Sequence, residues 1–269
     1  MDSAAVDVHW GAEKVYDYYD SVHNRNSYNN AGAKILGWVD YCGNYNNAHW
    51  AGTYMLFGGG DGITWGPVTS LDIVGHEFTH GVIEYSAGLG TSGESGALNE
   101  SFSDIFGNVI ERRVKQDTSW RIAEDMTFNG MGIRNMKYPK DFNHPNTYKG
   151  QYWSGNGKHG RTGVQNYWFY LLSEGGSGTN DNNHNYNVTG IGVEKAADIA
   201  YRNLTQYLLP GSGYAGAFLG SLDAAEDLFG INSNEYNQVM NAWCAVGVGC
   251  GLSANTLTVL QPNGGEQYK

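Results

Sequence analysis

Two histidines four residues apart are the side chains of this sequence best placed to do chemistry. They belong to the run His-Glu-Phe-Thr-His at 76–80. On an α-helix, His76 and His80 lie one turn apart on the same face, so both imidazoles can bind one metal ion. Glu77 points in a different direction from the two histidines. It would lie beside the metal's open position, where it can act as a base on a metal-bound water. The spacing therefore predicts half of a zinc site and a candidate base.

The pattern is specific but does not settle the question alone. With eight histidines in 269 residues, it arises by chance in roughly one such chain in a hundred. The alternative is a helix that carries two hydrogen-bonded histidines and no metal. Evidence for a third ligand is therefore needed.

A catalytic zinc ion takes three protein ligands and keeps a fourth position open. The segment 95–114 has helical periodicity and places Glu100 and Asp104 on one face. Glu100 would complete the site, and Asp104 would hold the far nitrogen of a ligating histidine. On spacing alone, an exposed acidic face explains this pair equally well.

Composition and charge bound the class of protein. The chain is 41% hydrophobic with a net charge of −11, which allows a sizeable core and argues against nucleic acid or an anionic membrane as partners. Its 39 glycines, 19 tyrosines and 16% charged residues are typical of loop-rich extracellular enzymes. No stretch approaches 18 apolar residues, and residues 1–3 do not open a signal peptide. We expect the mature part of a secreted protein with an added methionine, in preference to an intracellular protein.

Three cysteines indicate one small disulfide at most. Cys244 and Cys250 are six residues apart and could close a loop, whereas Cys42 has no local partner. A disulfide of this kind would fit an oxidising compartment.

Periodicity predicts an α+β chain that becomes almost entirely helical after residue 70. Residues 5–23 read as an amphipathic helix, and two short apolar runs at 35–41 and 51–57 read as hairpin-like strands. Residues 67–70 end the strand region and cap the histidine helix. The remaining segments are expected as follows: helices at 95–114, 163–173, 192–208, 214–229 and 233–245, a long loop-rich stretch at 117–158, a solvated loop at 177–187, and the start of an incomplete module at 257–265.

The segments 76–80 and 93–107 together closely resemble the zinc signature of the thermolysin family of neutral metalloproteases. Residues 45–50 are similar to the family's substrate-binding edge strand, and the resemblance runs from about residue 6 to residue 250. Its motifs are highly specific, so it favours a zinc site over two hydrogen-bonded histidines.

The resemblance implies roles for the site residues. Three residues would be zinc ligands: His76, His80 and Glu100. Asp104 would orient a ligating histidine, Glu77 would be the general base, and His159 would donate a hydrogen bond to the oxyanion. Asn47 and the backbone of Ala48 would hold an extended peptide, and Arg134 would bind a substrate carbonyl. Five residues fall near positions that line the pocket for the residue after the scissile bond: Trp65, Val68, Ile73, Ile122 and Ile133.

A second metal is also implied. Three acids match ligands of the family's calcium site: Asp72, Glu111 and Glu124. Clustered carboxylates repel one another without a hard cation, although three unrelated surface acids are the alternative. Ser119 and Arg121 stand where double-calcium members have acids, so we expect one calcium ion at most.

The sequence departs from the family in three places. Thr91 stands where the family usually has a tyrosine that assists the downstream histidine, and Ser154 replaces an acid that orients it. The resemblance also begins inside the family's first domain. Loss of one oxyanion donor typically costs on the order of 10²-fold or more in rate, so we expect slow or altered catalysis.

These observations predict a two-lobed α+β protein with the zinc-binding helix on the floor of the cleft. The expected divisions are a partial N-terminal lobe at 1–70, the central helix at 71–87, a helical lobe at 88–250 and a tail at 251–269. The function implied is that of a secreted, monomeric zinc endopeptidase that cleaves peptides or proteins before hydrophobic residues, accompanied by a propeptide or a missing N-terminal piece. A zinc-stabilised binding or adhesion module with decayed catalysis is the alternative, and the intact Glu77 argues against it.

Overall fold

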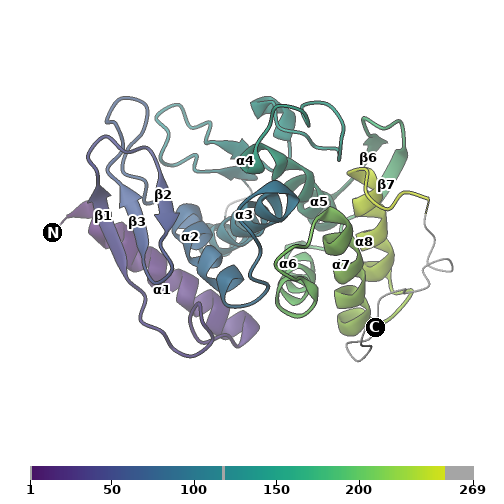
Figure 1. The fold of residues 1–269 in the computed structure, drawn as a ribbon, viewed down its shortest axis with the longest axis horizontal. Coiled ribbons are helices and arrows are strands. Elements are labelled where there is room, and N and C mark those ends of the chain that lie inside the picture. Colours follow the sequence, from purple (N-terminus) through teal and green to yellow (C-terminus); the bar gives the residue numbers. More distant parts are fainter. Residues whose placement is uncertain (1, 117–118, 252–269) are drawn as a thin grey trace, which may run out of the picture.

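A small sheet with one long helix and a larger group of helices lie on opposite sides of two central helices in this computed structural model (Figure 1). The structure describes residues 2–116 and 119–251. The sheet is confined to the N-terminal part, and the C-terminal part is mainly helical. This arrangement confirms the predicted α+β fold class.

Helix α1 (Ser3–His23) is long and amphipathic, as predicted. Asp2 caps its N-terminus by accepting a hydrogen bond from the backbone N–H of Ala4 at 3.0 Å. Val8, Val15 and Tyr19 are buried on one face, against the sheet and the central helices. The helix therefore forms the outer support of the N-terminal part.

The three strands β1 (Gly37–Tyr41), β2 (Ala48–Trp50) and β3 (Met55–Gly58) form a sheet of order β1-β3-β2. The prediction of two hairpin-like strands is wrong, because β1 and β3 run parallel and β2 pairs with β3 from the other side, antiparallel. Residues 42–54 are long enough to cross the sheet, and they contain β2 itself. As a result β2 is an edge strand, with one side free to pair with another chain.

The central helices α2 (Leu71–Glu84) and α3 (Gly93–Lys115) pack closely along each other. Their backbones meet where Gly75 faces Gly107: a Cβ atom at Gly75 would lie 2.9 Å from the Gly107 Cα, and one at Gly107 would lie 2.3 Å from the Asp72 carbonyl oxygen. Only glycine permits this approach. The close contact lies beside His76 and brings the polar faces of the two helices together.

Short elements and five more helices make up the rest of the described chain. In order they are β4 (Arg121–Ile122), β5 (Arg134–Asn135), the 3₁₀ turn η1 (Pro139–Phe142), α4 (Lys158–Arg161), α5 (Gly163–Glu174), β6 (Gly175–Thr179), β7 (Asn185–Thr189), α6 (Val193–Arg202), the π-helical turn η2 (Asn203–Tyr207), α7 (Tyr214–Phe229) and α8 (Asn234–Ala245). The predicted helices at 163–173, 214–229 and 233–245 are confirmed. The predicted helix at 192–208 changes to π-helical geometry at Asn203.

The polar run at 177–187, predicted as a loop, belongs instead to a β-hairpin. Strands β6 and β7 pair antiparallel over five residue pairs, from Gly175 opposite Thr189 to Thr179 opposite Asn185. Both faces of the hairpin are largely exposed, so the apolar alternation that marks a half-buried strand is missing. The expected segment at 257–265 lies outside the described residues.

The cysteines follow the sequence expectation. A disulfide joins Cys244 to Cys250, and Cys42 is exposed and unpaired. Within residues 2–116 and 119–251, no helix is both long and apolar enough to cross a membrane.

His23, the last residue of α1, is a partly buried histidine. Its ring stacks on Tyr201 at 3.8 Å between centroids, and its Nε2 lies 3.2 Å from the hydroxyl of Tyr18. Burial, assisted by the positive charge of Arg25, lowers the pKa of His23 to about 3. The folded protein therefore holds this imidazole neutral.

This shift predicts a pH dependence of stability. The unfolded chain takes up a proton at His23 near pH 6.5, and the folded chain does not, so stability is fully present above pH 6.5 and is lost as the pH falls toward 3. Between pH 7 and pH 5 the free energy of unfolding should fall by about 2 kcal/mol through this residue alone. Urea unfolding of the wild type and of His23→Phe at both pH values tests this. An identical pH dependence in the two proteins would contradict it.

Candidate active site

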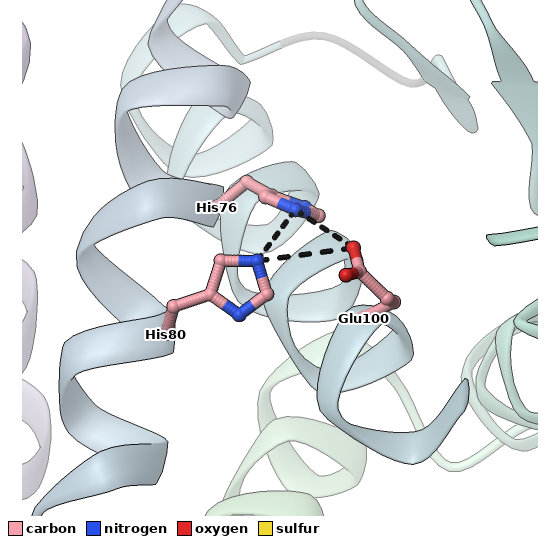
Figure 2. A group of neighbouring side chains, drawn as sticks. All are labelled: His76, His80 and Glu100. Carbon is pink, nitrogen blue, oxygen red and sulfur yellow. Dashed lines mark hydrogen bonds and ion pairs between the residues drawn. The ribbon is translucent and has the colours of Figure 1, made fainter. Parts of the chain in front are cut away.

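Three side chains from α2 and α3 point toward one another at the centre of the molecule: His76, His80 and Glu100 (Figure 2). The two Nε2 atoms are 3.1 Å apart, and Oε2 of Glu100 lies 3.4 Å from the first and 3.8 Å from the second. A tetrahedral ion with bonds of about 2.1 Å holds its ligand atoms about 3.4 Å apart. Two imidazoles and one carboxylate are also a ligand set that zinc prefers. The residues therefore fit a zinc ion in both spacing and chemistry.

The outer nitrogen of each imidazole is held by α3. Nδ1 of His76 lies 3.0 Å from Oδ1 of Asp104, and Nδ1 of His80 lies 2.7 Å from Oδ1 of Asn99. Ser103 Oγ also lies 3.1 Å from that second nitrogen. These contacts leave both Nε2 atoms directed at the common centre. Sequence reasoning gave no role to Asn99, although its place directly before Glu100 on α3 was visible.

Asp104 is the hub of a buried polar network. Arg134 donates to both of its oxygens, from Nε to Oδ2 at 2.7 Å and from Nη2 to Oδ1 at 2.6 Å. Asn166 of α5 adds a hydrogen bond to Oδ2 at 2.8 Å. Burial opposes ionisation of Asp104, but Arg134 and His76 hold its pKa well below the usual range. The structure thus ties Arg134, which the sequence resemblance assigned to substrate, to the ligand network.

The three ligand groups have strongly shifted acidities. Burial alone would lower the pKa of His76, but hydrogen bonds to Asp104 and Glu100 raise it to about 10. Burial and the neighbouring His76 lower the pKa of His80 to about 4. Burial opposes ionisation of Glu100, yet hydrogen bonds to His159 and His76 keep its pKa far below normal. The site is therefore built to hold a carboxylate beside positive charge.

Glu77 lies beside the candidate ligands and is outside the group of three side chains that could hold a metal ion. It is buried, and its Oε2 atom has no hydrogen-bond partner in the described structure. Burial raises the pKa of Glu77 to about 7, even though His76 beside it favours the ionised form. A carboxylate with an unpartnered buried oxygen and a pKa near neutrality is suited to take up and release a proton.

The opposite wall is formed by α4. Nε2 of His159 lies 3.3 Å from Oε1 of Glu100, and the side chain is 61% exposed. Nζ of the preceding residue, Lys158, lies 2.6 Å from the same oxygen. Thr91 also lines the cleft, whereas Ser154 is exposed and does not line it. Lys158 had no place in the sequence prediction.

The ligands open into a cleft of about 590 Å³. Its wall includes seven of the residues predicted to contact substrate: Asn47, Ala48, Trp65, Val68, Ile73, Ile133 and Arg134. Ile122 lies apart from this wall, because it is buried within β4, where it pairs with the backbone of Arg134. The cleft runs along the edge strand β2, whose first residue is Ala48, and Asn47 lines the cleft directly before the strand.

A second group of acids lies at the start of α2. Carboxylate oxygens of Asp72, Glu111 and Glu124 all lie within 4.8 Å of one another, and Oε2 of Glu124 is buried without a hydrogen-bond partner. Burial and the nearby Asp72 raise the pKa of Glu111 to about 8. Nζ of Lys115 donates to Oε1 of Glu111 at 2.7 Å. An oxygen-only set of this kind fits calcium.

Comparison with known proteins agrees with this geometry. Residues 1–84 match the family model for the thermolysin metallopeptidase catalytic domain, and residues 87–248 match that for the thermolysin metallopeptidase alpha-helical domain. Thermolysin of Alicyclobacillus acidocaldarius subsp. acidocaldarius is 42% identical over 254 residues, covering 92% of this chain and 46% of the relative. Bacillolysin of Bacillus cereus is 41% identical, covering 92% of this chain and 44% of the relative. The chain therefore spans about half the length of these curated relatives.

A solved structure extends the likeness to three dimensions. The precursor of protealysin, a metalloproteinase from Serratia proteamaculans, aligns with a TM-score of 0.79 and 31% identity over 92% of this chain and 79% of that one. Both halves of the chain match one family, and the ligand geometry lies where the two matched regions meet, on α2 and α3. The chain therefore belongs to the thermolysin metallopeptidase family.

Proposed function

We propose that this chain is a zinc-dependent endopeptidase that cleaves peptide bonds on the N-terminal side of hydrophobic residues. The observation that carries the proposal is the convergence of His76, His80 and Glu100 beside the unpartnered oxygen of Glu77 on the floor of an open cleft. A purely structural zinc site is closed by four protein ligands and has no use for a buried base. An open three-ligand site with such a base favours hydrolysis.

The three ligands would hold the zinc ion. When bound, it would supply a Lewis acid that polarises the scissile carbonyl and makes water more acidic. Glu77 takes a proton from the attacking water and passes it to the leaving amine. His159, on the opposite wall and largely exposed, is placed to donate to the carbonyl oxygen as negative charge develops there.

The substrate is an extended peptide. Strand β2 is at the edge of its sheet and lines the cleft, so an incoming chain can pair with the backbone at Ala48 while Asn47 holds it from the side. The apolar wall of Val68, Ile73 and Ile133 then receives the side chain after the scissile bond. Arg134 also faces the cleft, and its donors beyond the two on Asp104 are available to a substrate carbonyl.

We further propose one calcium ion on Asp72, Glu111 and Glu124. Their mutual repulsion and burial call for a hard cation. The Lys115 ammonium on Glu111 already supplies one positive charge to this cluster, in agreement with a single ion.

The protein would be secreted and monomeric, and made as a precursor. The disulfide supports secretion, and the precursor form of the protealysin match supports a precursor of this chain.

Cleavage-site mapping tests the proposed specificity. A digest of a denatured protein by the zinc-loaded chain, analysed by mass spectrometry, should show large apolar residues after most scissile bonds. Ile73→Lys, which puts a charge into the apolar wall, should reduce this preference at least about tenfold, because a charge has no partner there. Cleavage without regard to the following residue would contradict the assignment of the pocket.

One observation favours a second function. In the described part of the chain, the acidic group that contacts His159 is the candidate zinc ligand Glu100. The family resemblance leads one to expect a tyrosine and an acid that support this histidine, and the chain has Thr91 and Ser154 at those positions. A weakly supported donor fits a zinc-stabilised binding module with decayed catalysis. Such a module would bind a peptide and zinc together but would not cleave the peptide.

A further inference from the structure

We propose that Lys158 is a positioning residue of the active site, which holds Glu100 so that His159 can leave it for the substrate. This inference rests on the proposed peptidase function and adds a residue to it. Lys158 lies on α4, and its ammonium donates to Oε1 of Glu100 at 2.6 Å. It is the only lysine among the cleft-lining residues of the described chain.

The two oxygens of Glu100 have different tasks. Oε2 faces both histidines at 3.4 and 3.8 Å and is the ligand atom. Oε1 points the other way, to Lys158 at 2.6 Å and to His159 at 3.3 Å. A carboxylate that is held firmly at its outer oxygen keeps the inner one in place as a ligand. The shorter of the two contacts, with an ammonium group, is the stronger hold.

His159 can therefore move without leaving the carboxylate bare. Its side chain is 61% exposed and makes the longer of the two contacts, whereas the side chain of Lys158 is 33% exposed and makes the shorter one. Glu100 is buried, so an unpaired outer oxygen would be costly. With Lys158 in place, His159 exchanges its contact with Glu100 for one with the substrate carbonyl oxygen at little cost.

The test compares Lys158→Met with Lys158→Arg, and uses Lys34→Met, at an exposed position outside the cleft, as the matched control. Zinc affinity is measured by competition with a chromogenic chelator, and kcat and KM are measured on a fluorogenic peptide at saturating zinc. Lys158→Met should weaken zinc binding and lower kcat by about tenfold or more each, with KM within about twofold. Lys158→Arg should restore most of both, and Lys34→Met should behave as wild type.

A double-mutant cycle separates this role from a general structural one. In a His159→Ala background, Lys158→Met should lower kcat by much less than in the wild type, because the group that Lys158 releases is already gone. An equal effect in both backgrounds, or kcat unchanged at saturating zinc, would overturn the proposal. A folded, zinc-loaded wild type that cleaves no peptide would contradict the proposed function instead, and the zinc affinity of Lys158→Met would still decide whether Lys158 holds Glu100.

Discussion

Replacing Glu77 with alanine should abolish peptide cleavage and leave zinc bound. The carboxylate is buried beside the three ligand groups, and its Oε2 has no other partner, so its removal takes away the base and no ligand. General acid–base groups typically contribute about 10² to 10⁴-fold to a rate, and we expect a loss of kcat/KM of at least about 10³-fold, with one zinc per chain as in the wild type.

Glu77→Gln is the matched control for packing. The amide has the shape of the carboxylate but cannot take up the proton, so the glutamine protein should be as inactive as the alanine protein and at least as stable. Zinc content is measured by elemental mass spectrometry, and peptide turnover is measured on the same sample. Turnover within about tenfold of wild type in the zinc-loaded alanine protein would contradict the assigned mechanism.

Asp104→Ala should produce the largest loss of stability among single changes in the site. The carboxylate is fully buried and pairs with Arg134 through two hydrogen bonds, so alanine leaves a buried guanidinium without its counter-charge. Breaking a buried ion pair from one side typically costs about 3–5 kcal/mol. Zinc affinity should also fall by about 10 to 100-fold, because Nδ1 of His76 loses its acceptor.

The measurement is urea unfolding in excess chelator, so that bound zinc does not add to the stability of the folded state. Arg134→Met is the second single variant of a double-mutant cycle with Asp104→Ala. The double variant, without either charge, should be less destabilised than the sum of the two single variants. A cost below about 1 kcal/mol for Asp104→Ala would show that the network does not support the fold.

The histidine helix could be predicted from the sequence because its chemistry is local. Spacing alone fixes that His76 and His80 share one face of a helix and that Glu77 does not join them. The partner on α3 could not be chosen in this way. From spacing alone, Glu100 and Asp104 could belong to a metal site or to an exposed acidic face of the helix. Only the family resemblance favoured the metal site. Their convergence depends on how closely the two helices pack at Gly75 and Gly107, which no local pattern reveals.

The errors and omissions also have physical reasons. The hairpin of β6 and β7 is polar on both faces, so its strands carry no alternating signal. Strands β1 and β3 were expected to pair as a hairpin, because nothing in their apolar runs shows that β2 joins β3 from the other side. The sequence does not indicate a role for Lys158, because a lysine next to a histidine is not a motif. Its role depends on Glu100, 58 residues earlier, whose Oε1 lies 2.6 Å from the Lys158 Nζ.

Metal content measured together with peptide cleavage tests the central claim most directly. Purified protein is assayed as prepared, after removal of zinc by a chelator, and after zinc is restored, with calcium present throughout to keep the proposed calcium site filled. The proposed function predicts one zinc per chain, cleavage that disappears with the zinc, and cleavage that returns when zinc is added back. Cleavage that persists in the zinc-free protein, or a protein with one bound zinc that cleaves no peptide, would contradict it.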